Sequence, residues 1–143
     1  MKRSPLQKAK DNLWKEFSLF IKNRDKGICI TCGKSGLSGH NYHAGHFIPS
    51  AVGGLALRYR EDNVHGQCYH CNINLGSWGE RYAEVMEKKY GRDYVENLRQ
   101  LKYKVVKWTL EDYKIKTEYY KKVNAQGVNN KKNTRKAEDK YIW

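Results

Sequence analysis

Four cysteines stand in two pairs of identical spacing, Cys29 with Cys32 and Cys68 with Cys71. Two Cys-x-x-Cys pairs supply the four thiolates of a tetrahedral zinc site, and this spacing favours zinc over the alternative, disulfide bonds. The 35 residues between the pairs exceed the usual zinc-ribbon spacing, so the chain must fold back for the pairs to meet. We expect a structural zinc ion that holds the intervening segment rigid.

The five histidines crowd into the same part of the chain. Four lie between the cysteine pairs and the fifth lies inside the second pair: His40, His43, His46, His65 and His70. A metal-dependent nuclease needs an imidazole that deprotonates water, a divalent ion that neutralises charge at the scissile phosphate, and a group that orients the imidazole. Histidine and asparagine side chains in this segment could provide all three, so the segment favours phosphodiester hydrolysis.

A strong excess of positive charge points to a polyanionic partner. The chain carries 28 Lys and Arg against 15 Asp and Glu, a formal net charge of +13. Binding to DNA would release counterions from its phosphates, so DNA is the first candidate, although a basic balance also occurs in proteins without such a partner. No stretch is apolar enough to cross a membrane, and the N-terminus lacks the apolar core of a secretory signal. We therefore expect a cytoplasmic protein with no membrane partner.

Helices are expected on both sides of the cysteine- and histidine-rich segment. Apolar residues recur at helical spacing from Pro5 to Lys26. After Trp78 one apolar stripe ends at Gly91, a second stripe follows, and Thr109 begins a capping-box pattern for a third helix. The stretch from Asn124 to Lys140 is polar and basic, which predicts a disordered tail.

Between these helices the composition changes to Gly, Cys, His and Asn. Two short β-like runs, Tyr42–Ile48 and Leu55–Tyr59, flank the turn-forming pair Gly53-Gly54 and predict a small hairpin. The expected fold class is therefore α+β. Its expected segments are an N-terminal helix (1–26), a zinc-stapled core (27–91), C-terminal helices (92–123) and a basic flexible tail (124–143).

The core resembles a known family of phage nucleases. The residues that carry the resemblance are His43 to Pro49, Leu57 to Cys68, and Cys71 with Asn72. They are similar to those of the phage NinG (Rap) recombination endonucleases, which belong to the HNH group, and the flanking cysteines resemble those of phage recombination endonuclease VII. The resemblance covers about Gly27 to Gly91. It implies a ββα-metal (HNH) fold and a metal-dependent DNA endonuclease.

The resemblance also implies roles for three residues. His46 matches the histidine that activates water as general base, and Asn63 matches the asparagine that orients this histidine through its backbone. Asn72 matches a ligand of the catalytic ion, Mg²⁺ or Mn²⁺. Many HNH enzymes carry an Asp or His ligand immediately before the base, where this chain has Gly45. His43 shares a strand face with position 45 and is the alternative ligand.

Three further residues are candidates for DNA contacts. Arg58 and Arg60 alternate with apolar residues on the expected second strand, which would place both guanidinium groups on one face. They would serve there either as phosphate clamps or simply as a solvated face. His65 either contacts phosphate or stabilises the fold.

The family resemblance implies branched DNA, such as Holliday junctions or D-loops, as substrate. Two symmetric cuts at a junction would suit a homodimer, with the helices after Trp78 as the interface. Two alternatives stay open: an HNH nuclease that cuts duplex DNA generally or at particular sites, and a non-catalytic zinc-knuckle adaptor. The adaptor would bind nucleic acid without needing His46 or Asn72. The sequence assigns no role to the terminal Tyr141-Ile142-Trp143.

Overall fold

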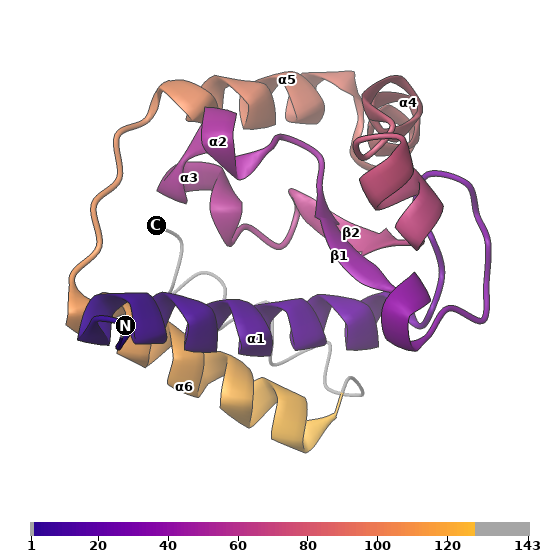
Figure 1. Cartoon of the computed structure of the whole chain (residues 1–143). Coiled ribbons are helices and arrows are strands. Elements are labelled where there is room, and N and C mark those ends of the chain that lie inside the picture. Colours follow the sequence, from indigo (N-terminus) through magenta and orange to yellow (C-terminus); the bar gives the residue numbers. More distant parts are fainter. Residues whose placement is uncertain (1, 128–143) are drawn as a thin grey trace.

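Helical layers lie on both sides of a small central hairpin. The computed structural model describes residues 2–127 of the chain. In Figure 1 strands β1 and β2 lie in the middle, helices α1 and α6 lie below them, and helices α4 and α5 lie above. The elements in chain order are α1 (Pro5–Asp25), η1 (Gly39–Asn41), β1 (His43–His46), α2 (Ser50–Gly53), α3 (Leu55–Arg58), β2 (Val64–Gln67), the π turn η2 (His70–Asn74), α4 (Gly79–Tyr90), α5 (Arg92–Gln100), η3 (Leu101–Tyr103) and α6 (Leu110–Gln126). This architecture confirms the expected α+β class.

Helix α1 forms where the apolar spacing predicts it. The Ser4 hydroxyl accepts a hydrogen bond from the Gln7 amide at 3.1 Å and caps the N-terminus. Lys26, in the left-handed conformation (φ 54°), ends the helix at the expected boundary. The buried face of the helix consists of Ala9, Leu13, Phe17, Phe20 and Ile21. This face packs against the hairpin and α6, and each large side chain buried there contributes about 2 kcal/mol.

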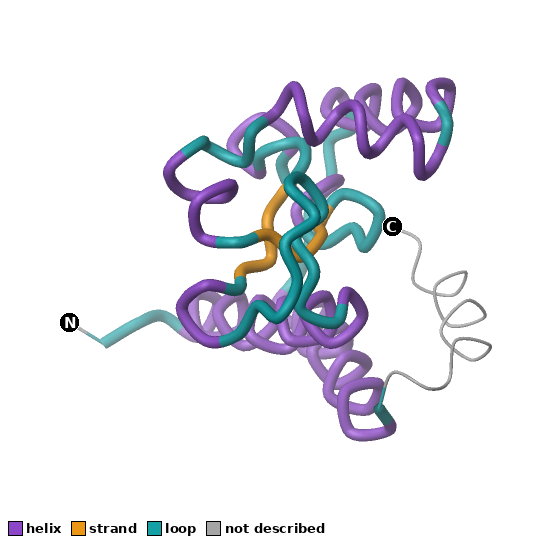
Figure 2. Tube along the Cα trace, turned by 90° about the vertical axis from the view of Figure 1, so that its right-hand side faces the viewer, coloured by secondary structure: helices purple, strands orange, loops and turns teal. Residues whose placement is uncertain are grey.

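The antiparallel hairpin has two faces with different neighbours. His43 pairs with Gln67 and His46 pairs with Val64, so alternate residues point to opposite sides. On the side that we call the α1 face, Ala44, His46 and Val64 lie toward helix α1. On the side that we call the α4 face, His43, Gly45, His65 and Gln67 lie toward α4 and the segment around η2. Figure 2, turned by 90°, shows the strands enclosed between the helical layers.

The second strand is formed by other residues than the sequence predicts. The run Leu55–Tyr59, expected as a strand, forms the short helix α3, and β2 instead occupies Val64–Gln67. A strand would turn Ala56 and Leu57 to opposite sides, whereas the helical turn buries both, at 2% and 0% exposure. The first strand lies inside the expected run but is shorter.

Helices α4 and α5 form the upper layer and a second core. Gly91 (φ 90°) ends α4 as predicted and lets the chain turn directly into α5. The core beneath these helices consists of Ile48, Leu57, Tyr82, Met86, Val95 and Leu98. Ile48 and Leu57 come from the segment between the strands. The second core therefore fixes the chain that follows β1 against the upper helices.

Helix α6 starts at the predicted capping box and packs on α1. The Thr109 hydroxyl accepts from the Asp112 amide at 3.2 Å, and the Asp112 carboxylate accepts from the Thr109 amide at 2.7 Å. The helix continues to Gln126, past Asn124, where the tail was expected to begin. The rest of that tail, including Tyr141-Ile142-Trp143, lies outside the described residues. Among residues 2–127, no helix has the length and apolar character to cross a membrane.

Candidate metal centre and catalytic site

The four cysteines meet in one cluster at the end of the hairpin. Their Sγ atoms all lie within 4.8 Å of one another, and Cys32 Sγ lies 3.9 Å from Cys68 Sγ. A tetrahedral zinc ion with Zn–S bonds of about 2.3 Å would hold its sulfurs about 3.8 Å apart. The four cysteines form no disulfide. The cluster therefore fits a four-thiolate zinc site.

Burial and hydrogen bonds set the charge of these thiols. Burial opposes ionisation of Cys29, but hydrogen bonds from the Thr31 hydroxyl and from backbone amides outweigh it and lower the pKa of this thiol to about 6. Burial, together with the neighbouring thiols, raises the pKa of Cys71 to about 12. Four thiols this close can all ionise only if a cation neutralises them. The donor set is therefore suited to a metal ion.

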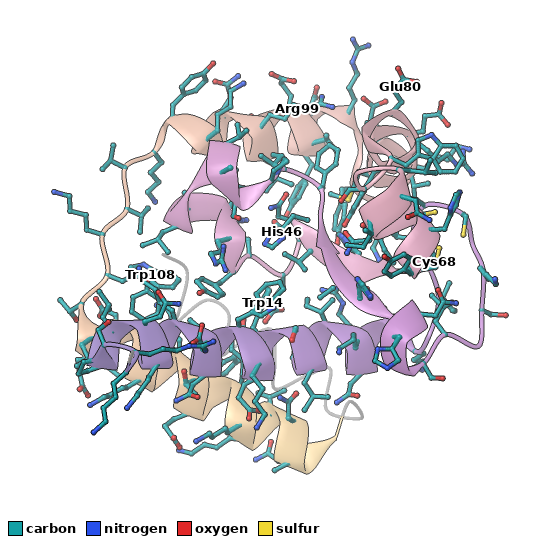
Figure 3. The ribbon with its side chains drawn as sticks, viewed as in Figure 1. Trp14, His46, Cys68, Glu80, Arg99 and Trp108 are labelled. Atoms are coloured by element: carbon teal, nitrogen blue, oxygen red, sulfur yellow. The ribbon has the colours of Figure 1, made fainter. Side chains whose placement is uncertain are left out.

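His46 projects from the α1 face of the hairpin, and its ring has a fixed orientation. The ring stacks on the Trp14 indole, with 5.3 Å between centroids and 14° between planes. Nε2 lies 2.8 Å from the Arg58 carbonyl oxygen, which can only accept, so Nε2 carries the hydrogen and Nδ1 keeps the lone pair. Burial lowers the pKa of His46 below its ordinary value of 6.5, so the ring is neutral at pH 7. Figure 3 shows His46 above Trp14, with Cys68 at the far end of the hairpin.

Asn63 holds the backbone at Ile48, before the short helices, and at Leu57, inside α3. Its Oδ1 accepts from the Ile48 amide at 2.8 Å, and its Nδ2 donates to the Ile48 and Leu57 carbonyls, both at 3.0 Å. The side chain is fully buried. These contacts fix the backbone close to His46 and next to Arg58, and so they fix the hydrogen bond between those two residues. The geometry suits the orienting role expected for Asn63.

His43 and Asn72, the two expected ion ligands, meet on the α4 face. Asn72 Nδ2 donates to His43 Nδ1 at 3.0 Å, and His43 Nε2 donates to the His40 carbonyl at 2.9 Å. Both ring nitrogens of His43 are thus engaged, which argues against direct ligation and for a positioning role. Asn72 Oδ1 accepts one hydrogen bond, from the Ser77 hydroxyl at 3.2 Å, and has a second lone pair to offer an ion. This pair lies on the opposite face of the hairpin from His46.

His65 stabilises the fold and is too deeply placed to contact DNA. It is 1% exposed, so of the two roles expected for it burial excludes the phosphate contact and leaves the structural one. Its Nδ1 lies 3.0 Å from the Tyr82 hydroxyl and its Nε2 lies 3.0 Å from the Tyr90 hydroxyl. The Tyr82 hydroxyl donates in turn to the Gly45 carbonyl at 2.8 Å. This chain of hydrogen bonds supports the backbone immediately before His46.

The two arginines expected to clamp phosphate have different surroundings. Because Leu55–Tyr59 is not a strand, Arg58 and Arg60 share no strand face, and that part of the prediction was wrong. Arg60 forms a two-point ion pair with Asp62, at 2.8 and 2.6 Å, which neutralises its charge. Arg58 lies over the Trp14 ring at 5.6 Å, and within residues 2–127 no carboxylate is within ion-pair distance of it. Only Arg58 therefore keeps its charge available on the α1 face.

Three residues at the site carry no clear signal in the sequence: Trp14, Gln67 and Tyr82. Tyr82 occupies an ordinary core position of its helix, and Trp14 lies partly buried beside the apolar stripe of α1. Neither position tells which part of the hairpin the side chain covers. Gln67 lies opposite His43 only because of the strand register. A correct prediction of that register would have placed Gln67 on the α4 face.

The fold and the cysteine cluster define a small α+β protein with a candidate four-thiolate metal centre. Residues 2–136 match the family model described as Bacteriophage Lambda NinG protein, so the chain belongs to the NinG family. Similar curated proteins are Protein ninG of Escherichia phage lambda (32% identical), of Salmonella phage P22 (33%) and of Escherichia phage 933W (30%), each over 106 residues. These matches cover 73% of this chain but only 50 to 51% of each relative, so the chain spans about half their length. No solved structure gives a significant match.

Proposed function

We propose that this protein is a metal-dependent endonuclease that hydrolyses DNA phosphodiester bonds, with His46 as general base. The observation that carries the proposal is the hydrogen bond from His46 Nε2 to the Arg58 carbonyl, because it fixes the tautomer in which Nδ1 can accept a proton. Burial lowers the pKa of the ring, so the base is neutral at pH 7. Water that loses a proton to Nδ1 would attack phosphorus in line with the leaving 3′ oxygen, giving a 5′ phosphate and a 3′ hydroxyl.

A divalent ion, Mg²⁺ or Mn²⁺, would supply the positive charge that stabilises the transition state and the leaving oxygen. Asn72 would hold it, since Oδ1 is a neutral oxygen ligand with a lone pair beyond its hydrogen bond to Ser77. The zinc cluster would have a structural role only, because four thiolates complete the coordination of zinc. Cys71 and Asn72 are consecutive, so zinc binding would also hold the Asn72 amide in place.

The base and the ion site lie on opposite faces of β1, and a phosphate that crosses this strand could reach both. Gly45 and His46 are consecutive, so their Cα atoms are about 3.8 Å apart. Within the described residues β1 pairs only with β2, so its other edge has no strand partner. The Arg58 guanidinium, on the α1 face, would neutralise the phosphate from the side of the base.

For the substrate we propose branched DNA, such as Holliday junctions or D-loops, on the strength of the family resemblance. The net charge of +13 supports a DNA partner of some kind. Two symmetric cuts at a junction need two active sites, which a homodimer would provide. The chain spans only about half the length of its curated relatives, so junction preference is tested apart from cleavage itself.

Cleavage of a labelled four-way junction beside a linear duplex of the same sequence tests the proposal. With zinc-loaded protein and added Mg²⁺ or Mn²⁺, we expect wild type to cut and His46→Ala to lose at least about a hundredfold in rate, because general-base catalysis contributes that much. His40→Ala is the matched control. The His40 side chain is exposed, and His40 contacts His43 through its backbone carbonyl, which alanine keeps, so this variant should cut as wild type does.

Both variants must first be shown to retain one zinc ion per chain, by native mass spectrometry. Faster cutting of the junction than of the duplex would support the recombination role, and equal cutting would favour a general duplex nuclease. Binding of both DNAs without cleavage, whatever divalent ion is added, would overturn the nuclease and favour the zinc-knuckle adaptor.

A further inference from the structure

Within residues 2–127, the buried side chain of Gln67 has hydrogen-bond partners for its amide nitrogen but not for its amide oxygen. Gln67 is 0% exposed at the end of β2, and its Nε2 donates to the Ser77 carbonyl at 3.0 Å and to the Thr31 hydroxyl at 3.3 Å. Because a carbonyl only accepts, the contact with Ser77 fixes which way the amide points. Oε1 accepts no hydrogen bond from the part of the chain that the structure describes. A buried amide oxygen of this kind destabilises the fold unless something binds it.

Gln67 Oε1 and a second amide oxygen, Asn72 Oδ1, both lie next to Gly45. A Cβ atom built on Gly45 would lie 1.9 Å from Gln67 Oε1 and 3.0 Å from Asn72 Oδ1. Because glycine has no Cβ, both oxygens border the same small space on the α4 face. His43 fixes the second oxygen, because its Nδ1 accepts from Asn72 Nδ2 and so turns Oδ1 away from the ring.

We propose that Gln67 Oε1 is a ligand of the divalent ion, together with Asn72 Oδ1. The inference rests on the proposed function and names the group that takes the place of the acidic side chain absent at Gly45. Two amide oxygens beside one small space suit a hard cation such as Mg²⁺ or Mn²⁺. Both ligands are neutral, so the protein alone should bind the ion weakly, and phosphate oxygens of DNA would complete its coordination.

Paramagnetic Mn²⁺ tests the assignment in the zinc-loaded, full-length protein without DNA. In NMR spectra of isotope-labelled protein, substoichiometric Mn²⁺ should broaden the side-chain amide signals of Gln67 and Asn72 first, because paramagnetic relaxation falls steeply with distance. Gln126, exposed at the end of α6, is the internal control and should broaden only at higher Mn²⁺. Broadening of Gln67 no earlier than of Gln126 would overturn the assignment.

A pair of variants separates ligation from packing. Gln67→Ala should weaken Mn²⁺ binding, followed by electron paramagnetic resonance, by about tenfold or more. The double variant Gly45→Asp with Gln67→Ala should bind Mn²⁺ at least as tightly as wild type, because a carboxylate then stands where the amide oxygen was. Unchanged Mn²⁺ affinity in Gln67→Ala would refute the proposal. Zinc content and the amide shifts of β1 and β2 establish that each variant is folded.

These measurements are independent of DNA cleavage. If Mn²⁺ broadens Gln67 first but no DNA is cut, the ion site stands and the nuclease proposal fails. If His46-dependent cleavage is observed while Gln67→Ala binds Mn²⁺ as wild type does, only the assignment of Gln67 fails.

Discussion

His46 and His65 lie on opposite faces of the hairpin, and burial lowers the pKa of both. For His46 the result is a neutral ring with a basic Nδ1. For His65 the hydrogen-bonded neighbours decide the tautomer: the Tyr82 hydroxyl gives its hydrogen to Gly45, so it accepts from His65 Nδ1. Nε2 of His65 then accepts from the Tyr90 hydroxyl. A second proton on this ring would go to Nε2, so the Tyr90 hydroxyl would have to accept instead of donate, and a charge would stand in a buried site.

The fold should therefore lose stability in acid through His65. Burial holds the pKa of this side chain at about 3 in the folded protein, against an ordinary value of 6.5. Between these two values the unfolded chain binds a proton that the folded protein does not, so the free energy of unfolding decreases as pH falls, by up to about 1.4 kcal/mol per pH unit. Urea unfolding at pH 7, 6 and 5 should show a shallower pH dependence for His65→Gln than for wild type.

Zinc release adds a pH dependence of its own to both proteins, so the quantity to compare is the difference between their slopes. Parallel slopes would mean that His65 gains a proton as easily in the folded protein as in the unfolded chain, contrary to the burial seen here.

At the scale of elements, helix α1 controls the surroundings of His46 although it lies outside the cysteine- and histidine-rich segment. Trp14 comes from the middle of this helix, and its indole covers one side of the imidazole. The same indole lies under the Arg58 guanidinium. Helix α1, through Trp14, thus shields one side of the His46 ring from water and holds the Arg58 guanidinium next to it.

Removing Trp14 should raise the pKa of His46. Trp14→Ala exposes the ring, and since burial is the main cause of the lowered pKa, the value should move up toward 6.5. NMR titration of the His46 ring signals measures the shift. Leu19→Ala, at an exposed position of the same helix, is the control and should leave the pKa of His46 unchanged. A Trp14→Ala protein with an unchanged His46 pKa would show that other groups keep water from the ring.

The long helices could be predicted from the sequence, but the short helices α2 and α3 could not, and the hairpin only in part. Helices α4 and α6 follow from apolar spacing and from end signals at Gly91 and Thr109, which act locally. The strand Val64–Gln67 contains weak strand formers, and it forms because helices distant in the sequence bury all four of its residues. The run Leu55–Tyr59 is too short for its apolar pattern to distinguish a strand from a helix.

The candidate site, too, could be predicted from the sequence only in part. Cysteine spacing predicts the sulfur cluster, because each Cys-x-x-Cys pair is a local feature, and the structure confirms that the pairs meet. The expected roles of His46, Asn63 and Asn72 stay predictions. The place of Gln67 could not be predicted, because it depends on strand register rather than on any local pattern.

At the scale of the whole molecule, two apolar cores are accompanied by a smaller third cluster. One core links α1, α6 and the hairpin, and the other links α4 and α5 to the segment after β1. The third cluster consists of Cys29, Leu37, Tyr42, Cys68 and Cys71. So few apolar groups supply little hydrophobic stabilisation, and a metal ion would be the main force holding this end of the hairpin together.

Zinc removal should therefore loosen this end selectively. Chelation at pH 7 should release one zinc ion per chain and lower Tm by on the order of 10 °C, because a structural zinc contributes several kcal/mol. Hydrogen exchange should then quicken in residues 29–42 and 68–74, while amides of α1 and α6, which pack in a core without cysteines, stay protected. Equal loss of protection throughout would mean that the molecule unfolds as one unit without zinc.

The close approach of Gln67 to Gly45 also constrains the order in which this sequence can change. A side chain at position 45 would place its Cβ 1.9 Å from Gln67 Oε1, so an aspartate that arises there first must displace a buried amide. Once position 67 has become smaller, the same aspartate can be accommodated. The two positions are epistatic in this sense, because the effect of a substitution at one depends on the residue at the other. A lineage can therefore exchange the amide for a carboxylate without this steric clash only by mutating position 67 first, and on the proposed assignment that intermediate lacks one ion ligand until position 45 changes.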